Sequence, residues 1–209
     1  SGWRAGSGEH VVIEGDEYDT AFFDKGPKFL HYRPRNVILT SVEFDHADIY
    51  RDLDHVKSSF RKLIEIIPDD GSLVVCGDYP DAKEIAVAAR CPRVSYGHSA
   101  ESDWKAINIE FREGRTFFEP CYHGKSEGRL EVDVIGRHNV MNALAVYAMG
   151  RYLGIARQEL RCAFHGFAGV KRRQEKRGER RGVLVIDDFA HHPTAVRETI
   201  EAVKSSYHG

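Results

Sequence analysis

The segment Asn36-Val-Ile-Leu-Thr-Ser41 carries apolar side chains at successive positions rather than at alternate ones. A strand with this pattern is buried on both faces, as in the parallel sheets of α/β proteins. Three further short apolar runs stop, as this one does, at polar residues, and they cover residues 10–14, 73–76 and 183–186. The four runs therefore predict an α/β fold built on a mostly parallel sheet.

The segments between these runs carry helical patterns. Between residues 52 and 67, apolar side chains recur every three or four positions from Leu53 to Ile67, which places them on one face of a helix. Pro68 ends this helix. Similar patterns predict flanking helices over residues 81–90, 136–153, 156–164 and 194–207, the last with Pro193 in its first turn.

The hydrophobicity pattern changes in the middle of the chain. Three short segments there alternate partly between apolar and polar side chains, at residues 104–111, 115–122 and 129–134. Glu113-Gly114 and His123-Gly124 provide the turns. We therefore expect an antiparallel meander in addition to the parallel sheet.

Composition excludes several classes of function. The chain has 209 residues, 42% of them apolar, with 30 basic and 32 acidic side chains. This balance argues against a partner such as nucleic acid or a membrane surface, and no apolar run approaches the roughly 20 residues of a membrane span. The four cysteines form no CxxC pair, which argues against a zinc knuckle and fits a cytoplasmic protein with free thiols.

A domain boundary is expected near residue 170. Residues 171–181 hold seven basic side chains, which predicts a surface segment or linker. The remainder, residues 171–209, offers one strand and one helix, too little for an independent core. We therefore predict one domain over 1–170 and the truncated start of another over 171–209. The chain begins with neither Met nor a signal peptide, which favours a piece excised from a longer protein.

Acidic and histidine-rich clusters follow three of the predicted strands. They lie at residues 14–19, 43–48 and 187–193. Ligands bind beyond the carboxyl ends of parallel strands, so this repeated placement predicts one shared site. Glu14 and His46 offer an oxygen and an imidazole to Mg²⁺, which usually takes one or two protein ligands. The alternative is that the acids only solubilise loops and that His46 caps a turn.

Other motifs allow a nucleotide or a zinc interpretation. Asn139 and Asn142 share one face of a first helical turn, where they could pair with adenine or simply cap the helix. Arg173 lies in the basic segment and would suit a phosphate, or be one of several solvated charges. A zinc hydrolase would use His46 with His191 and His192, but adjacent histidines at a helix start point apart and no H-E-x-x-H motif occurs.

Five short motifs follow one another along the chain: Val12-Ile-Glu-Gly-Asp-Glu-Tyr-Asp19, Phe44-Asp-His-Ala-Asp48, Gly136-Arg-His-Asn-Val-Met-Asn-Ala143, Gly169-Val-Lys-Arg-Arg173 and Asp187-Asp-Phe-Ala-His-His-Pro-Thr194. Together they make the chain resemble the Mur ligase family, ATP-dependent amide-bond formers of peptidoglycan synthesis. The resemblance covers nearly the whole chain. It implies a central ATPase domain and the opening of a Rossmann-like C-terminal domain.

The resemblance also implies a nucleotide and metal site. Glu14 and His46 match the Mg²⁺-binding positions of the family. Asn139 and Asn142 match positions on the adenine side, with His138 beside them.

Further matches fall at the predicted domain junction. Arg173 matches the arginine that contacts the ATP phosphates, and Asp188 matches an acid near the ribose. His191 belongs to a segment that faces the active-site cleft. The resemblance thus implies His46, Arg173 and His191 as catalytic residues. The family's carbamylated lysine has Lys57 and Lys62 as its nearest counterparts, and neither is assigned.

The implied reaction joins UDP-N-acetylmuramate to an amine through an acyl phosphate. The stretches over residues 17–25 and 43–49 favour the branch that uses the murein tripeptide L-Ala-γ-D-Glu-meso-diaminopimelate in peptidoglycan recycling. The branch that adds L-alanine is the alternative, and a non-catalytic nucleotide-binding module is a second one. The family's phosphate loop is absent from this sequence, so we expect the chain by itself to be inactive, with the missing N- and C-terminal domains as its partners.

Overall fold

The computed structural model describes residues 6–112 and 114–207. Within them, the central strands are β3 (Asn36–Leu39), β4 (Ser72–Cys76), β5 (Arg93–Tyr96), β6 (Trp104–Arg112), β7 (Arg115–Tyr122), β8 (Lys125–Ser126) and β9 (Leu130–Val132). They form one sheet in the order β3-β4-β5-β6-β7-β8, with β9 paired to β7. Strands β3 to β6 run parallel, and β7 pairs antiparallel with β6, β8 and β9. The predicted combination of a parallel sheet with an antiparallel meander is confirmed.

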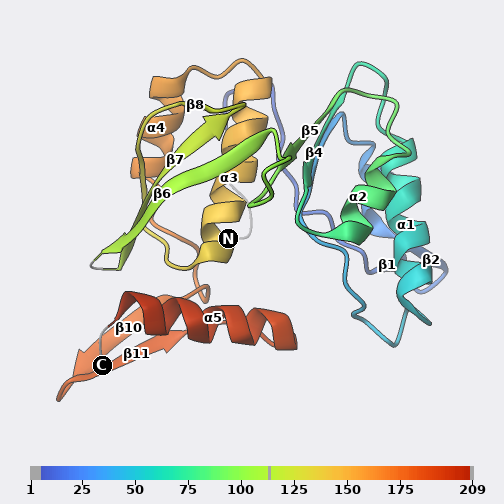
Figure 1. Cartoon of the computed structure of the whole chain (residues 1–209). Helices are drawn as coiled ribbons and strands as arrows, with labels where there is room; N and C mark the ends of the chain where they lie inside the picture. The colour runs from blue at the N-terminus through green and yellow to red at the C-terminus, as the bar shows by residue number, and fades with distance from the viewer. Residues whose placement is uncertain (1–5, 113, 208–209) are drawn as a thin grey trace.

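Helices cover both faces of this sheet (Figure 1). α1 (Leu53–Glu65) and α2 (Pro80–Ala86) pack on one face, and α3 (Arg137–Tyr152) and α4 (Arg157–His165) pack on the other. β4 is buried along its length and serves both layers. Its Leu73 and Val75 belong to the core beneath α1 and α2, whereas Val74 and Cys76 belong to the core beneath α3. This double burial explains the apolar residues at successive positions.

A buried lysine ties α1 to α2. The ammonium group of Lys57 lies 2.8 Å from a carboxylate oxygen of Asp81 and also contacts Glu84. Hydrogen bonds to these two carboxylates raise the pKa of Lys57. Carbamylation requires a neutral amine, and the raised pKa keeps the amine of Lys57 protonated. This arrangement therefore favours an ion pair between α1 and α2 over carbamylation of Lys57.

The expected strand over residues 10–14 is wrong. This segment has no regular secondary structure and pairs with no strand among the described residues, and Val11 and Val12 are 84% and 94% exposed. Strand geometry depends on a hydrogen-bonded neighbour, and an apolar run alone supplies none. The chain continues instead into a small hairpin of β1 (Asp19–Ala21) and β2 (Asp24–Pro27), followed by the 3-10 helix η1 (Lys28–Tyr32).

Two other boundaries differ from expectation. α2 ends at Ala86 rather than at residue 90, because the amides of Val87, Ala88 and Ala89 bond to carbonyls three residues back, in tight turns. The turn predicted at Glu113-Gly114 involves Glu113, which lies outside the described residues. β5 was not predicted because Arg93 and Ser95 interrupt its apolar pattern.

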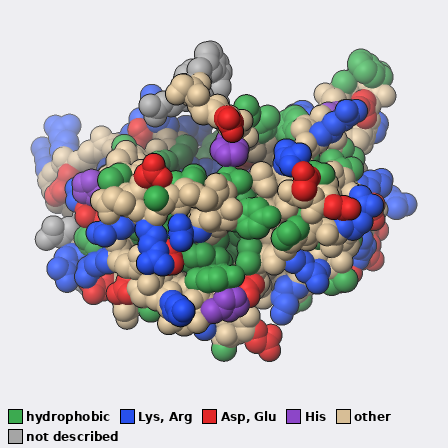
Figure 2. Space-filling model, turned by 90° about the horizontal axis from the view of Figure 1, so that it is seen from above, with side chains coloured by type: hydrophobic (Ala, Val, Ile, Leu, Met, Phe, Trp, Pro, Cys, Tyr) green, Lys and Arg blue, Asp and Glu red, His purple; other side chains and the backbone are tan. Residues whose placement is uncertain are grey.

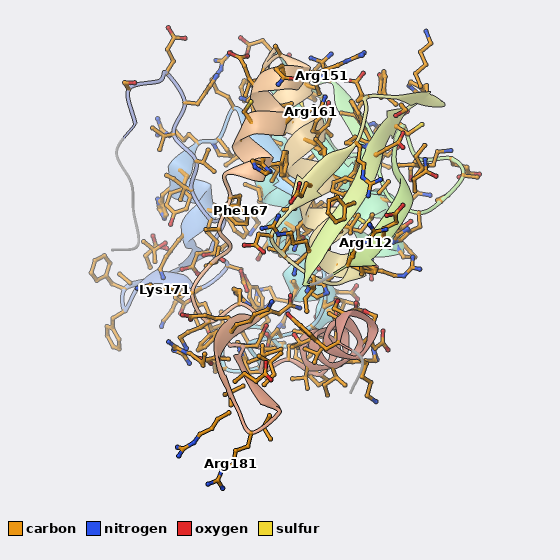
Figure 3. The ribbon with its side chains drawn as sticks, turned by 90° about the vertical axis from the view of Figure 1, so that its left-hand side faces the viewer. Arg112, Arg151, Arg161, Phe167, Lys171 and Arg181 are labelled. Carbon is orange, nitrogen blue, oxygen red and sulfur yellow. The ribbon has the colours of Figure 1, made fainter. Side chains whose placement is uncertain are left out.

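The basic segment is a strand and not only a linker. β10 (Glu175–Arg180) pairs antiparallel with β11 (Val183–Asp187). Arg181 and Gly182 form the tight connection with φ of +53° and +77°, as two-residue hairpin turns require. Figure 3 shows Arg181 projecting from the hairpin tip. The basic side chains of this segment therefore do not prevent it from forming a hairpin strand.

β10, β11 and α5 (Pro193–Ser206) form the C-terminal unit of the chain. Within this unit, α5 packs against α3 (Figure 1). Ala202 is the buried residue of α5. A Cβ atom on Gly136, at the start of α3, would come within 2.6 Å of the Ala202 side chain, and the φ of Gly136 is +95°. Both observations explain why glycine occupies this position.

The surface agrees with the balanced composition. Acidic and basic side chains are interspersed over the face seen in Figure 2. Cys76, Cys91 and Cys121 are buried free thiols, and Cys162 is exposed. None of the helices in the described part of the chain has the length and apolar character needed to cross a membrane.

Leu144 tests the core beneath α3. It is 0% exposed, so Leu144→Ala should lower the free energy of unfolding by about 2–5 kcal/mol through lost burial and a cavity. Urea denaturation monitored by circular dichroism measures this change. Val146→Ala, on the exposed side of the same helix, is the control and should change stability by less than about 0.5 kcal/mol. Equal effects of the two substitutions would contradict the assigned packing.

Candidate functional site

The first two sequence clusters meet at His46. Its Nε2 lies 2.9 Å from Oε1 of Glu17, and the Tyr18 ring centroid lies 4.2 Å from that of His46. The hydroxyl of Tyr50 donates to the backbone carbonyl of Glu17 at 2.8 Å and so fixes the segment. His46 has a φ of +57°, a left-handed conformation that turns the chain just beyond β3.

The second and third clusters meet at Glu43. The Thr194 hydroxyl, in the first turn of α5, donates to Oε2 of Glu43 at 3.0 Å. Nδ1 of His192 lies 3.8 Å from the same oxygen. These contacts bring the carboxyl end of β3 next to the N-terminal end of α5, across 151 positions of sequence.

The start of α3 forms the third part of the site. The Asn139 side-chain amide donates to the Ile135 carbonyl at 2.8 Å and to Oε1 of Gln174 at 3.1 Å. Nδ2 of Asn142 lies 3.5 Å from Oδ1 of Asn139, which confirms that both amides share one helix face. The backbone N–H of Gln174 donates to Asp188 at 2.9 Å. The predicted adenine-side and ribose-side residues are therefore linked through Gln174.

Burial and neighbouring charges shift the pKa values of two side chains near the contact between α5 and the sheet. Burial lowers the pKa of His138, although Glu198 and Asp188 oppose the shift. Burial likewise raises the pKa of Tyr79, and Glu43 and Glu198 add to that increase. Tyr79 thus lies among carboxylates from both sides of the junction between α5 and the sheet.

Three predicted residues are exposed. Glu14 is exposed, and Glu17 rather than Glu14 contacts His46. Arg173 lies in the turn before β10, and its guanidinium makes no ion pair within the described part of the chain. Nδ1 of His191 bonds to the Phe189 carbonyl at 3.1 Å. The structure therefore brings His46, Asn139, His138 and Asp188 into contact networks. Asn142 is also exposed, although it lies 3.5 Å from Asn139, and these other three face solvent.

The three histidines of the zinc interpretation are held by different partners. His46 contacts Glu17, His192 lies near Glu43, and His191 bonds to a backbone carbonyl. Among the described residues no three histidine, cysteine or acidic side chains are grouped as metal ligands. A magnesium site needs fewer protein ligands. Carboxylate oxygens of Glu17 and Asp45 lie 2.9 Å and 3.7 Å from Nε2 of His46. Carboxylates are ligands that Mg²⁺ prefers, whereas this imidazole nitrogen is occupied by Glu17 in the structure.

Some residues of these networks carried little sequence signal. Glu17 and Glu43 lie inside the acidic clusters, but nothing in the sequence ranked them above their neighbours. Thr194 ends one of the motifs that carry the family resemblance but was given no role, and Glu198 had no motif of its own. Gln174 follows a run of basic side chains and had no motif of its own. Its role depends on the chain reversal that brings it back to α3.

Comparison with known proteins assigns the family. Residues 4–150 match the family model described as the Mur ligase middle domain. The chain therefore belongs to the Mur ligase family.

Individual relatives refine the similarity. The chain is 36% identical over 206 residues to UDP-N-acetylmuramate–L-alanyl-γ-D-glutamyl-meso-2,6-diaminoheptandioate ligase of Haemophilus influenzae, covering 99% of this chain and 45% of the relative. It is 37% identical over 203 residues to UDP-N-acetylmuramate–L-alanine ligase of Salinibacter ruber, covering 97% and 41%. The chain thus spans less than half the length of these curated relatives.

A solved structure agrees with the fold. UDP-N-acetylmuramate:L-alanyl-γ-D-glutamyl-meso-diaminopimelate ligase from Neisseria meningitides matches with a TM-score of 0.68 and 40% identity. The match covers 77% of this chain and 48% of that one.

His138 should make stability depend on pH. Because burial lowers its pKa in the folded chain, the unfolded chain binds the proton more tightly. The free energy of unfolding should therefore fall as pH drops through about 6.5 and continue to fall until the lower folded pKa is reached. His138→Gln removes this contribution. Urea titrations between about pH 7.5 and about pH 5.5 should show a shallower decline for the variant, and parallel declines would contradict a buried neutral imidazole.

Proposed function

We propose that this chain is part of an ATP-dependent ligase that joins UDP-N-acetylmuramate to the tripeptide L-Ala-γ-D-Glu-meso-diaminopimelate in peptidoglycan recycling. The observation that carries the proposal is the junction at Glu43, where the end of β3 meets α5 through Thr194 and His192. Membership of the Mur ligase family supports the same conclusion.

The proposal divides the chain near residue 170. Residues 1–170 would be most of the central ATPase domain, and residues 171–209 the opening of the C-terminal domain. The UDP-binding domain and the remaining C-terminal domain would belong to the rest of the protein. No Gly-x-x-Gly-Lys-Thr-Thr loop occurs in the 209 residues, so we expect ligase turnover to require the whole cytoplasmic enzyme.

In the proposed reaction, ATP phosphorylates the muramate carboxylate, and the amine of the peptide then attacks the acyl phosphate. His46 would hold Mg²⁺ together with carboxylates of the first cluster, Glu17 by contact and Glu14 by resemblance. When bound, the ion neutralises charge on the transferring phosphoryl group. Positioning and charge neutralisation are most of what phosphoryl transfer requires from a protein.

Residues at the junction would hold the nucleotide. Asn139 and Asn142 present carboxamides at the start of α3, on the side where we place adenine. Asp188 follows β11 and would lie near the ribose, with His191 facing the cleft. The exposed guanidinium of Arg173 would be available to phosphate oxygens when the C-terminal unit closes. Closure would exclude water that otherwise hydrolyses the acyl phosphate.

The choice of amino substrate rests on two short stretches. The relatives from Haemophilus influenzae and Salinibacter ruber differ in their named substrate, yet their sequence identities to this chain are nearly equal. The segments Glu17-Tyr-Asp-Thr-Ala-Phe-Phe-Asp-Lys25 and Glu43-Phe-Asp-His-Ala-Asp-Ile49 favour the tripeptide.

Substrate competition tests this choice. The full-length enzyme containing this chain should release phosphate faster with UDP-N-acetylmuramate and tripeptide than with UDP-N-acetylmuramate and L-alanine, at equal amine concentrations. A coupled phosphate assay measures both rates. Faster turnover with L-alanine would reject the recycling reaction in favour of the L-alanine ligase, and no turnover with either amine would favour a non-catalytic nucleotide-binding module.

Substitution of the metal-site residues tests the chemistry. In the same enzyme, His46→Ala or Glu14→Gln should lower the ligase rate by about 100-fold or more, because the ion would lose a ligand. The melting temperature should shift by less than about 4 °C. His165→Ala removes an exposed imidazole whose ion-pair partner among the described residues is Glu131, and it should leave the rate unchanged. A loss of stability that matches the loss of activity would indicate a packing role instead.

A further inference from the structure

One side of α5 faces the remainder of the chain. Thr194, Glu198 and Ala202 follow one another at intervals of four residues and therefore share a helix face. Each of them meets a residue outside the C-terminal unit, and these partners are, in the same order, Glu43, His138 and Gly136. Figure 1 shows α5 lying across the start of α3, in agreement with these contacts.

The N-terminal end of α5 lacks a cap of its own. The side chain of His192, at the cap position, makes no hydrogen bond to the first turn, and that turn contains no acidic residue. Pro193 has no backbone N–H, whereas the N–H groups of Thr194 and Ala195 cannot bond to carbonyls within the helix. This end of the helix is also the positive end of its dipole. α5 therefore begins with a partial positive charge that no acidic side chain of its own balances.

Glu43 supplies a negative charge at this end from another part of the chain. Its carboxylate, in the loop after β3, accepts the hydrogen bond from the Thr194 hydroxyl at 3.0 Å. The Glu43 side chain is 35% exposed, and neither a lysine nor an arginine pairs with it among the residues that the structure describes. Nδ1 of His192 lies 3.8 Å from the same carboxylate. Glu43 thus takes the place of a first-turn acid, although it lies outside α5.

The loop after β3 links α5 to the rest of the candidate site. Through His46 this loop contacts Glu17 of the first cluster at 2.9 Å, and through Glu43 it contacts α5. Arg173, just before β10, and Asp188, just after β11, belong to the unit that α5 holds in place. The position of α5 therefore sets where these two residues lie relative to His46.

We propose that Glu43 is a positioning residue that docks the C-terminal unit by acting as a cap for α5 from outside that unit. Docking would fix Arg173 and Asp188 at the nucleotide, and this consequence rests on the proposed ATP-dependent function. Glu43 acts through α5 and is not a ligand of the nucleotide.

Hydrogen exchange of the α5 amides measures docking in the 209-residue chain. A helix of 14 residues is marginal in water by itself, so its amides are protected mainly while the helix is packed. Glu43→Ala removes both the charge and the hydrogen bond at the start of α5. The α5 amides should then exchange about fivefold faster, whereas those of α1 should keep their rate.

Two further variants make the measurement specific. Glu65→Ala removes another exposed glutamate, at the end of α1, and should leave exchange of α5 at the wild-type rate. Thr194→Val removes the hydrogen bond from the side of α5 and should also speed exchange, to a smaller extent than Glu43→Ala. The double variant should exchange no faster than Glu43→Ala, because both substitutions break one interaction.

Three results would overturn the inference. The first is unchanged exchange of α5 in Glu43→Ala. The second is full additivity of Glu43→Ala and Thr194→Val, which would mean that the two side chains act independently. The third is equal acceleration in α1 and α5, which would indicate a general loss of stability rather than undocking.

Kinetics of the full-length enzyme test the consequence for the nucleotide. If only the docked unit completes the nucleotide site, Glu43→Ala should raise the KM for ATP by about two- to fivefold and leave kcat unchanged. Glu65→Ala should change neither constant. A lower kcat at an unchanged KM would overturn the positioning role. An inactive wild-type enzyme would count against the proposed ligase function instead, and the exchange experiment would still decide whether Glu43 docks α5.

Discussion

β4 places side chains into two cores at once, and the architecture depends on this double burial. Its Leu73 and Val75 pack beneath α1 and α2, while Val74 and Cys76 pack beneath α3. Parallel pairing with β3 and β5 then aligns the carboxyl ends of neighbouring strands at one edge. Polar residues that follow these strands are consequently delivered to the same side of the molecule, which is where ligands bind in parallel α/β sheets.

The candidate site is assembled at this edge by contacts between distant segments. Glu17 reaches His46, Glu43 reaches Thr194, and Gln174 links Asn139 with Asp188. Each contact uses a charged or amide group that would be costly to leave partly buried without a partner. The segments therefore stabilise one another, and the C-terminal unit is held against the central sheet by polar contacts and by the close approach of α5 to the start of α3.

This junction has a consequence for a ligase mechanism. An acyl phosphate must be kept from water, and a unit joined mainly by polar contacts can open and close more readily than one joined by a large apolar core. Ala202 is the buried residue of α5, and the contacts of its N-terminal end with Glu43 are a hydrogen bond from Thr194 and the nearby His192. In the proposed reaction, opening of this junction would release the products.

Patterns in the amino-acid sequence were enough to predict most helices and strands, the parallel and antiparallel parts of the sheet, and the family. Buried strands and amphipathic helices are encoded by local periodicity, which needs no partner to be recognised. Tertiary structure decided the rest. The run over residues 10–14 reads as a strand but lacks a neighbour to pair with, and the basic segment forms β10 because β11 lies beside it. Gln174 becomes significant only when the chain brings it to Asn139, because a hydrogen bond depends on distance in space and not along the sequence.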